Sequence, residues 1–260
     1  MIGGDPFTVL PRAEVTALYR PLRSGAWELT LSPLVICPGY WGQARPVPNM
    51  AALRRDGDVW MSLTPLEVES QALGIAAARG HVVIMGLGMG WAAAECALDP
   101  AVSAVTVVEF DPAVIALHRD LALFERLPGG CGGKVRLEQG DAMTWRPDAP
   151  VDLLMPDIWL PVVSDTDRAG EVRQMQANVG AAAVYFWGQE LEIARQAAAR
   201  GLAIDDAGIA AVVAEWDLPL IGPATPHYAE RTKAAARAWM RGRWLPGMTS
   251  QKSSPSISTF

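Results

Sequence analysis

The chain has 260 residues, of which 50% are hydrophobic and 19% are charged, a composition typical of an ordered globular protein with a substantial core. Its formal net charge of −6 argues against a chain-wide attraction to nucleic acid. The three cysteines form neither a disulfide framework nor a zinc motif, and no apolar run reaches the roughly 18 residues of a membrane span. We therefore expect a cytoplasmic protein that has no metal centre and binds neither nucleic acid nor membranes.

Residues 1–63 are predicted to form a small β-rich N-terminal lobe or lid. Short strand-like runs lie at 27–31 and 59–61, and the turn signal Asp56-Gly57 precedes the second run. The aromatic side chains of this segment can either line a pocket or fasten the lobe to the core, and both interpretations stay open. Tyr40 is the candidate for a substrate pocket.

A helix is predicted to begin at Thr64, because Thr64, Pro65 and Glu67 have the spacing of a capping box with proline at the first helical position. This helix runs toward Arg79 and stops at Gly80. Apolar strands and helical segments then alternate along the chain. Strands are expected at 82–85, 105–109, 135–138, 151–155 and 181–187, and helices at 91–98, 112–124, 168–179 and up to about residue 200.

This alternation predicts an α/β fold of the Rossmann-like, doubly wound type, with a mainly parallel sheet and helices on both faces. We assign residues 64–246 to that domain. Beyond Gly201 the pattern weakens: residues 209–216 have the period of either a helix or a strand, and a last helix is expected from Thr225-Pro226 to about Met240. The polar tail at 247–260 is expected to be disordered.

A glycine-rich loop, Gly86-Leu87-Gly88-Met89-Gly90, follows the first predicted strand of the parallel sheet and opens a helix. Glycines at such a position allow a tight turn and let a ligand approach the backbone near a helix N-terminus. A turn of this kind can also serve only the close packing of a strand against a helix. The loop alone is therefore weak evidence for a ligand.

Two further signals stand at the ends of the next two strands. Glu109 follows Gly90 by 19 residues, the spacing at which an acidic side chain meets a ribose diol in dinucleotide folds. Asp141 can accept a hydrogen bond from an adenine amino group, and Ala142 leaves room for the ring. With Leu87 and Phe110 beside them, these residues predict an adenosine site at one edge of the sheet.

Three segments of the sequence resemble the spermidine synthase-like branch of class I S-adenosylmethionine-dependent methyltransferase folds. They are VVIMGLGMGWAAAECALDPAVSAVTVVEFDPAVIALHRD from residue 82, VRLEQGDAM from residue 135 and VDLLMPDIW from residue 151. The resemblance is carried by the acids Glu109 and Asp111 after the second strand, by Gly140-Asp141 after the third and by Asp157 after the fourth. It implies that the chain binds S-adenosylmethionine and releases S-adenosylhomocysteine.

The sequence departs from the polyamine synthases of that branch at two acidic positions. Met89 stands where those enzymes carry an aspartate for the aminopropyl donor, and Leu160 stands where they carry a second aspartate for the amine substrate. Trp91 also replaces the glycine that usually follows the loop. The resemblance therefore implies the adenosine site more strongly than it implies polyamine synthesis.

Asp157 is the candidate catalytic residue, because it closes the fourth strand at the edge where open α/β sheets bind substrates. A structural role as a helix cap or as a ligand of backbone amides stays open for it. Trp159 can wall the acceptor pocket or simply pack. The histidines His81 and His118 are expected to be structural, and His227 has only a weak claim to the site.

The leading hypothesis is a methyltransferase that acts on a small molecule or a peptide. Aminopropyl transfer is the second enzymatic hypothesis, and a non-catalytic protein that retains the adenosine site is the third. The acceptor and the oligomeric state are not specified by the sequence, and a homodimer stays open.

Overall fold

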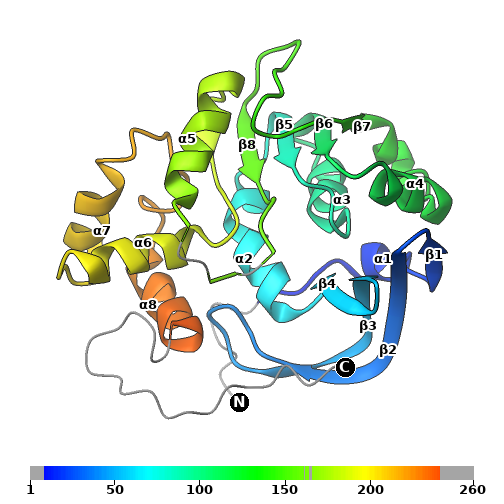
Figure 1. Ribbon diagram of the computed structural model, residues 1–260, viewed down its shortest axis with the longest axis horizontal. Helices are drawn as coiled ribbons and strands as arrows, with labels where there is room; N and C mark the ends of the chain where they lie inside the picture. The colour runs from blue at the N-terminus through cyan, green and yellow to red at the C-terminus, as the bar shows by residue number, and fades with distance from the viewer. Residues whose placement is uncertain (1–8, 161, 164–165, 241–260) are drawn as a thin grey trace.

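The computed structural model describes residues 9–160, 162–163 and 166–240, which form an α/β fold with two sheets (Figure 1). The larger sheet has five parallel strands in the order β7-β6-β5-β8-β9. Their bounds are β5 Gly80–Met85, β6 Val102–Glu109, β7 Val135–Gln139, β8 Leu153–Pro156 and β9 Ala183–Val184. From β5 the chain moves outward to β6 and β7, and then returns to the other side of β5. The predicted Rossmann-like doubly wound fold is confirmed, with its topological switch point between β5 and β8.

Helices cover both faces of this sheet, as the prediction required. They are α1 Ala13–Thr16, α2 Pro65–Ala76, α3 Trp91–Leu98, α4 Pro112–Leu121, α5 Arg168–Val179, α6 Gln189–Ala199, α7 Asp206–Val213 and α8 Tyr228–Trp239, with a 3₁₀ helix at Pro128–Lys134. The segment 209–216, which fits either period, is helical over most of its length. The last helix begins at Tyr228, three residues after Thr225.

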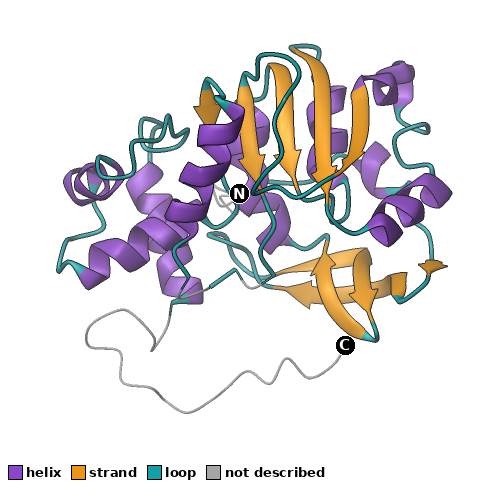
Figure 2. Cartoon of the chain, turned by 45° about the horizontal axis from the view of Figure 1, so that its top comes forward, coloured by secondary structure: helices purple, strands orange, loops and turns teal. Residues whose placement is uncertain are grey.

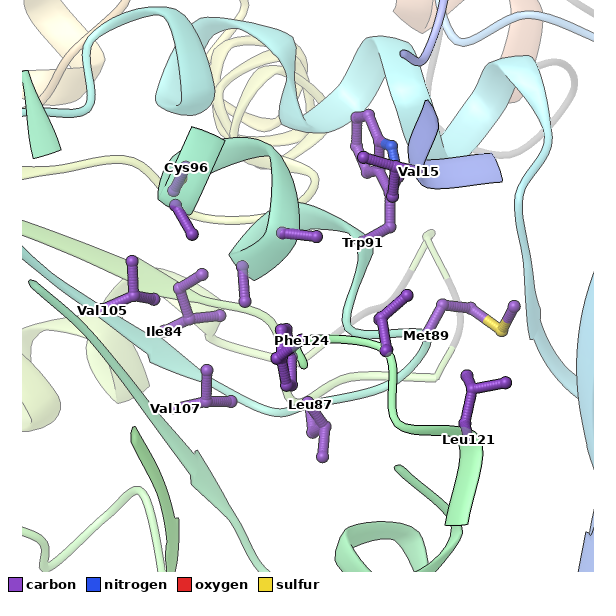
Figure 3. Close-up of a cluster of buried hydrophobic side chains, with 14 of the residues drawn as sticks. Val15, Ile84, Leu87, Met89, Trp91, Cys96, Val105, Val107, Leu121 and Phe124 are labelled. Atoms are coloured by element: carbon purple, nitrogen blue, oxygen red, sulfur yellow. The ribbon is translucent and has the colours of Figure 1, made fainter. Parts of the chain in front are cut away.

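Alternate residues of the strands supply two separate cores. On β5, Val82 and Ile84 pack with the helices α3 and α4, whereas Val83 and Met85 pack with α5 and α6. Figure 3 shows the first of these clusters, with Ile84 and Val107 facing side chains of α3. Burying a side chain such as Val or Ile stabilises the fold by about 1.5–3 kcal/mol. Strand β5 is apolar on both faces and therefore contributes side chains to both cores.

The smaller sheet is antiparallel, with the order β1-β2-β3-β4, and it lies within the segment expected to form the lobe. Its strands are β1 Leu22–Ser24, β2 Trp27–Cys37, β3 Arg45–Arg55 and β4 Asp58–Ser62. The turn between β3 and β4 has positive φ at Asp56 (51°) and Gly57 (91°), as an Asp-Gly hairpin requires. The predicted turn is therefore confirmed.

Strand β3 was not expected from the sequence, because Pro46 and Pro48 interrupt its pattern. Both prolines lie where β3 pairs with β2 alone, since β4 pairs only with residues from Ala52 onward. Proline lacks the N–H that a central strand needs, but an edge position tolerates it. The strand therefore exists because its proline-containing half has only one neighbour.

The antiparallel sheet lies below the carboxyl ends of the parallel strands, whose arrowheads point toward it in Figure 2. Two indole N–H groups connect it to the remaining structure. Trp27 Nε1 donates to Asp111 Oδ2 at 3.0 Å, and Trp239 Nε1 on α8 donates to the carbonyl oxygens of Gly39 and Tyr40 at 3.2 and 3.1 Å. The lobe is thus attached to the larger domain at two places, at the start of α4 and at α8.

Helix α2 begins as predicted, with Thr64 as its N-cap and Pro65 at its first position, but the capping box is not formed. The Thr64 side chain accepts no capping hydrogen bond, and Glu67 lines the pocket instead. The last strand is short and covers only Ala183–Val184. The tail 247–260, expected to be disordered, lies outside the described residues, and the division into a lobe and a domain at residue 63 stays a prediction.

Candidate functional site

A pocket of about 540 Å³ lies at the carboxyl edge of the parallel sheet and is covered by the antiparallel sheet. The parallel sheet contributes the ends of β5, β6, β7 and β8, and the lobe contributes residues of β2, β3 and β4. The lining includes Trp27, Arg55, Trp60, Met61, Glu67, Gly86, Gly88, Glu109, Phe110, Asp111, Gly140, Asp141, Ala142, Asp157, Ile158, Trp159, Leu160 and Trp187. The volume is within the range of small-molecule sites, and its position is the switch point where open α/β sheets bind ligands.

The glycine loop adopts left-handed backbone conformations at all three glycines, with φ of 98° at Gly86, 47° at Gly88 and 68° at Gly90. A Cβ at Gly86 would collide with the carbonyl oxygen of Asp157, and one at Gly88 would collide with the thioether of Met61. Packing between β5 and β8 therefore accounts for the first glycine, whether or not a ligand is bound. Gly86 and Gly88 also line the pocket, and their role in binding a ligand stays a prediction.

His118 on α4 contacts the backbone of this glycine loop. Its Nε2 lies 2.8 Å from the carbonyl oxygen of Gly88, and burial lowers the pKa of its imidazole to about 4. The ring is therefore neutral near pH 7, so Nε2 carries the proton and donates to Gly88. The side chain also stacks on Phe124, with ring centroids 6.1 Å apart. His118 thus positions the loop and is not exposed to the pocket.

Glu109 stands at the end of β6 with both carboxylate oxygens engaged by backbone. Oε2 accepts from Leu87 N at 2.9 Å, and Oε1 accepts from Asp111 N at 2.7 Å. Each oxygen keeps a further lone pair, so the fixed carboxylate can accept from two hydroxyl groups of a ligand. The next residue, Phe110, is 75% exposed and presents its ring to the same pocket.

Asp141 and Ala142 follow β7 on the same edge. Asp141 Oδ1 accepts from Met143 N at 2.9 Å, which leaves Oδ2 available for a ligand donor. Ala142 is buried, and Gly140 before it packs against Val108 and Trp145. The structure therefore brings Gly86, Gly88, Glu109, Phe110, Asp141 and Ala142 to one pocket. Leu87 and Gly90, which were also predicted to bind adenosine, do not line it, and Leu87 is 5% exposed and packs in the hydrophobic core. A binding role for these residues stays a prediction.

The opposite end of the pocket has an acidic floor, formed by Glu67 on α2 and Asp157 after β8. Asp157 Oδ2 accepts from Gln71 Nε2 at 2.8 Å. Burial raises the pKa of Asp157 to about 7, against the opposing effects of nearby Arg168 and of the Gln71 hydrogen bond. The pKa of Glu67 is raised well above its ordinary value by burial and then by the charge of Asp157. The two carboxyl groups therefore compete for one negative charge.

Arg168 on α5 lies behind this floor, buried between two indole rings. Its guanidinium carbon is 5.0 Å from the ring centroid of Trp159 and 5.3 Å from that of Trp187. Trp159 Nε1 in turn donates to Glu171 on α5. Trp159 therefore lines the pocket and also packs against Arg168, and its role as a wall for an acceptor stays a prediction.

Tyr40 does not lie in the pocket, contrary to the expectation. It is fully buried in a separate cluster with Trp41 and side chains of α6 and α8, and its hydroxyl donates to Glu190 Oε2 at 3.0 Å. The sequence left open whether such aromatics line a pocket or fasten the lobe. Tyr40 fastens it, whereas Trp60 lines the pocket.

Sequence reasoning missed several contributors to the site, among them Glu67, Gln71, Trp187 and Arg55. Glu67 and Gln71 are one helical turn apart on α2, which also carries Glu69 and Ser70, and this run of buried polar residues was the available signal. Arg55 lies over the rings of Trp27 and Trp60, at 5.4 and 5.9 Å. Its place depends on strand β3, which the sequence did not reveal.

Within residues 9–160, 162–163 and 166–240, no group of three or more His, Cys, Asp and Glu side chains is arranged to hold a metal ion. In the same part of the chain, no helix is both long and apolar enough to cross a bilayer.

No family model and no curated protein sequence matches the chain. Among solved structures, it is similar to the glycopeptide N-methyltransferase MtfA in complex with S-adenosyl-L-homocysteine, at 20% identity and a TM-score of 0.34, over 43% of each chain. It is also similar to S-adenosylmethionine-bound CalS10, an amino pentose methyltransferase from Micromonospora echinaspora, at 25% identity and 0.29, over 42% of each chain.

A third similar structure is the methyltransferase domain of bacterial CtHen1, at 20% identity and a TM-score of 0.31, over 41% of this chain and 57% of that chain. The chain spans less than half the length of MtfA and of CalS10. In each case the similarity covers less than half of this chain.

Proposed function

We propose that the chain is an S-adenosylmethionine-dependent methyltransferase that acts on a small-molecule or peptide acceptor. One observation carries the proposal: the glycine loop, Glu109, Asp141 and Asp157, which lie far apart in sequence, line one pocket at the switch point of the sheet. Close packing accounts for the glycines of the loop, but it does not require three acids around one cavity.

The residues of the pocket fit an adenosyl ligand. Glu109, held by two backbone N–H groups, accepts from the ribose hydroxyls, Asp141 Oδ2 accepts from the adenine amino group, and Phe110 covers the base. The bound donor supplies an activated methyl group on a sulfonium. The protein aligns an acceptor with that group for in-line displacement, and Asp157 takes the proton that the acceptor loses.

Aminopropyl transfer is less well supported, because neither position that distinguishes polyamine synthases offers an acid. Met89 is buried with Leu121 and Val15 in the hydrophobic core shown in Figure 3, and Leu160 is half exposed at the pocket. Without an acid at Met89, the ammonium group of an aminopropyl donor would be left unpaired at the glycine loop, which would cost several kcal/mol. The likeness to the spermidine synthase-like branch therefore concerns the adenosine side of the pocket.

Calorimetry with S-adenosylmethionine, S-adenosylhomocysteine and methylthioadenosine tests the proposal, together with the variants Glu109→Ala and Glu109→Gln. Loss of charge-assisted hydrogen bonds worth about 1.5–3 kcal/mol lowers the affinity at least about tenfold. Glu109→Gln retains an acceptor for the loop amides and separates loss of charge from loss of loop structure.

Glu125→Gln, an exposed surface change, is the matched control and leaves the affinity unchanged. No heat with any of the three ligands, or unchanged affinity in a folded Glu109→Gln variant, overturns the adenosine site. Formation of methylthioadenosine in place of S-adenosylhomocysteine during turnover replaces methyl transfer by aminopropyl transfer. The cytoplasmic location, the absence of a nucleic-acid partner and a homodimer stay predictions.

A further inference from the structure

Met61 lies on strand β4 of the lobe, and its side chain rests on the glycine loop. Its Sδ accepts the N–H of Met89 at 3.0 Å, and a Cβ at Gly88 would collide with its thioether. In the pairing of β3 with β4, Met61 stands opposite Leu53, which also lines the pocket. The side chain of Met61 is therefore directed from the lobe onto the backbone of the loop.

The N–H of Met89 is held in its direction by a hydrogen bond on the other side of the same peptide group. His118 Nε2 donates to the carbonyl oxygen of Gly88 at 2.8 Å, and the two polar groups of a trans peptide point in opposite directions. Tyr19 Oη donates to the carbonyl oxygen of Met89 at 2.8 Å, so the next peptide group is fixed as well. The loop therefore presents the N–H of Met89 to the lobe.

The acceptor that this N–H meets is a weak one. A thioether sulfur accepts hydrogen bonds poorly, whereas a carboxylate forms bonds roughly twice as strong as those between neutral groups. Helix α3 begins two residues later, at Trp91, and the positive end of its dipole favours a negative group nearby. A carboxylate of a ligand would therefore bind the N–H of Met89 in preference to the sulfur of Met61.

Met61 also separates two cavities. One is the pocket of about 540 Å³, and the other is a cavity of about 30 Å³ between the glycine loop, α2 and the start of α3. Met61 lines both, together with Gly86, Glu67 and Asp157. Methionine is unbranched and has three rotatable bonds, so its side chain can turn away from the loop. That movement would join the cavities and extend the pocket along the loop to the start of α3.

The charges around the small cavity suit a zwitterion. Glu67 and Asp157 line it, so an anion without a cationic group of its own would be repelled. The other acids of the pocket follow β6 and β7 and do not line the small cavity: Glu109, Asp111 and Asp141. The amino-acid tail of S-adenosylmethionine carries an ammonium group beside its carboxylate. The ammonium group can face Glu67 and Asp157 while the carboxylate faces the loop.

We propose, on the basis of the methyltransferase function proposed above, that Met61 is a specificity-determining residue of the donor site. It covers the place of the donor's amino-acid tail, and it turns away when the tail carboxylate accepts the N–H of Met89. Methylthioadenosine has the adenosine part but no such tail, so it leaves Met61 on the loop. The site thereby distinguishes a complete donor from its adenosine part through one lobe side chain.

The test compares S-adenosylhomocysteine, which has the tail, with methylthioadenosine, which lacks it, by calorimetry. Met61→Ala removes the group that the tail must displace, so S-adenosylhomocysteine should bind about fivefold more tightly, whereas the affinity for methylthioadenosine should stay within about twofold. Met61→Leu keeps the bulk but offers no acceptor, so its effect should be smaller and in the same direction. Met50→Ala, a change on β3 of the same lobe away from both cavities, is the matched control and should change neither affinity.

A second measurement follows Met61 in the unmodified protein. With ¹³C-methyl-labelled methionine, S-adenosylhomocysteine should shift the methyl signal of Met61, which is identified by its loss in Met61→Leu. Methylthioadenosine should shift this signal less, because it does not displace the side chain.

Three outcomes overturn the proposal: S-adenosylhomocysteine that binds but shifts no methionine methyl signal, a Met61 signal that both ligands shift equally, or a Met61→Ala variant that changes both affinities alike. The first needs no variant, so it stands even if the variants fail to fold. If neither ligand binds the unmodified protein, the proposed methyltransferase is contradicted. If both bind without these differences, only the role of Met61 is contradicted.

Discussion

Glu67 and Glu69 lie two residues apart on α2, and both are buried, yet their surroundings differ. Glu69 Oε2 accepts from the backbone N–H groups of Tyr40, Trp41 and Gly42 at 2.8, 3.2 and 3.0 Å, and its Oε1 receives Arg45 Nη1 at 2.9 Å. On the other side of the helix, Glu67 shares the pocket floor with another acid. The two carboxylates are therefore both buried, and they differ in the number of hydrogen-bond donors around them.

Glu190 is an intermediate case. It is fully buried and its pKa is raised to about 7 by burial, although hydrogen bonds with Tyr40 and Tyr185 oppose that rise. Tyr185 Oη lies 2.8 Å from the Ser70 carbonyl oxygen and 3.2 Å from Glu190 Oε1. A hydroxyl has one proton, so it donates to only one of these oxygens, and a protonated Glu190 can supply the second bond.

The largest effect is expected for Glu69→Gln. The change removes the charge that pairs with Arg45 and places an amide NH₂ among N–H donors, so we expect a loss of about 3 kcal/mol in the free energy of unfolding. Urea denaturation measures it, with Glu125→Gln as the control. A loss below 1 kcal/mol would mean that the donors around Glu69 are replaced by water at little cost.

Asp157→Asn is expected to raise the free energy of unfolding, whereas Glu69→Gln lowers it. The folded pKa of about 7 lies above the ordinary value of 3.8, so the stabilising contribution of the protonated form is complete below pH 3.8 and is lost as the pH rises toward 7. Asparagine keeps an acceptor for Gln71 and carries no charge. The variant should therefore be more stable than the parent by about 2 kcal/mol at pH 8 and equal to it near pH 3.5. Equal stability at both pH values would contradict the raised pKa.

The pairing of the two floor acids is tested by a double-mutant cycle with Glu67→Gln and Asp157→Asn. Each single change removes the repulsion between the carboxylates, so the stabilisation by the double variant should fall short of the sum by on the order of 1 kcal/mol at pH 8. Thermal unfolding at pH 8 provides the four values. Strict additivity would show that the acids titrate independently.

The smallest effect is expected for Asp111→Asn. Asp111 is partly exposed, and its oxygens have one donor each: Ala113 N at the start of α4 and Trp27 Nε1 from the lobe. Asparagine is an equally good N-cap, but its NH₂ cannot accept from the indole. A loss of about 0.5 kcal/mol in unfolding free energy is expected. A loss as large as that of Glu69→Gln would mean that donor number does not govern these sites.

The parallel half of the molecule could be predicted from the sequence because its signals are local. Val82–Met85 is apolar on both faces and is followed at once by the glycine loop, and Glu109 stands directly at the end of its strand. The order of the strands follows from the doubly wound topology. Gly86, Glu109 and Asp141 therefore reached the pocket through their positions at strand ends.

The lobe and the acidic floor could not be predicted in the same way, since they depend on contacts between distant segments. Nothing near Tyr40 in the sequence indicates Glu190, its hydrogen-bond partner 150 residues away. Glu67 matched a capping box, a local pattern, although its carboxylate meets Asp157 after β8. In both cases a residue had two plausible environments, and only the tertiary structure selected one.

The hydrogen bonds of Trp239 to the carbonyl oxygens of Gly39 and Tyr40 join residues 200 and 199 positions apart. During synthesis, the loop that contains Tyr40 leaves the ribosome long before α8 exists. Contacts this distant in sequence close a large loop and form late in folding. The parallel sheet can assemble from residues 80–184 while the nascent chain is still growing. The contact of Trp239 with Gly39 and Tyr40 can form only after α8 has emerged. We therefore expect the attachment of the lobe to α8 to be the last step of folding.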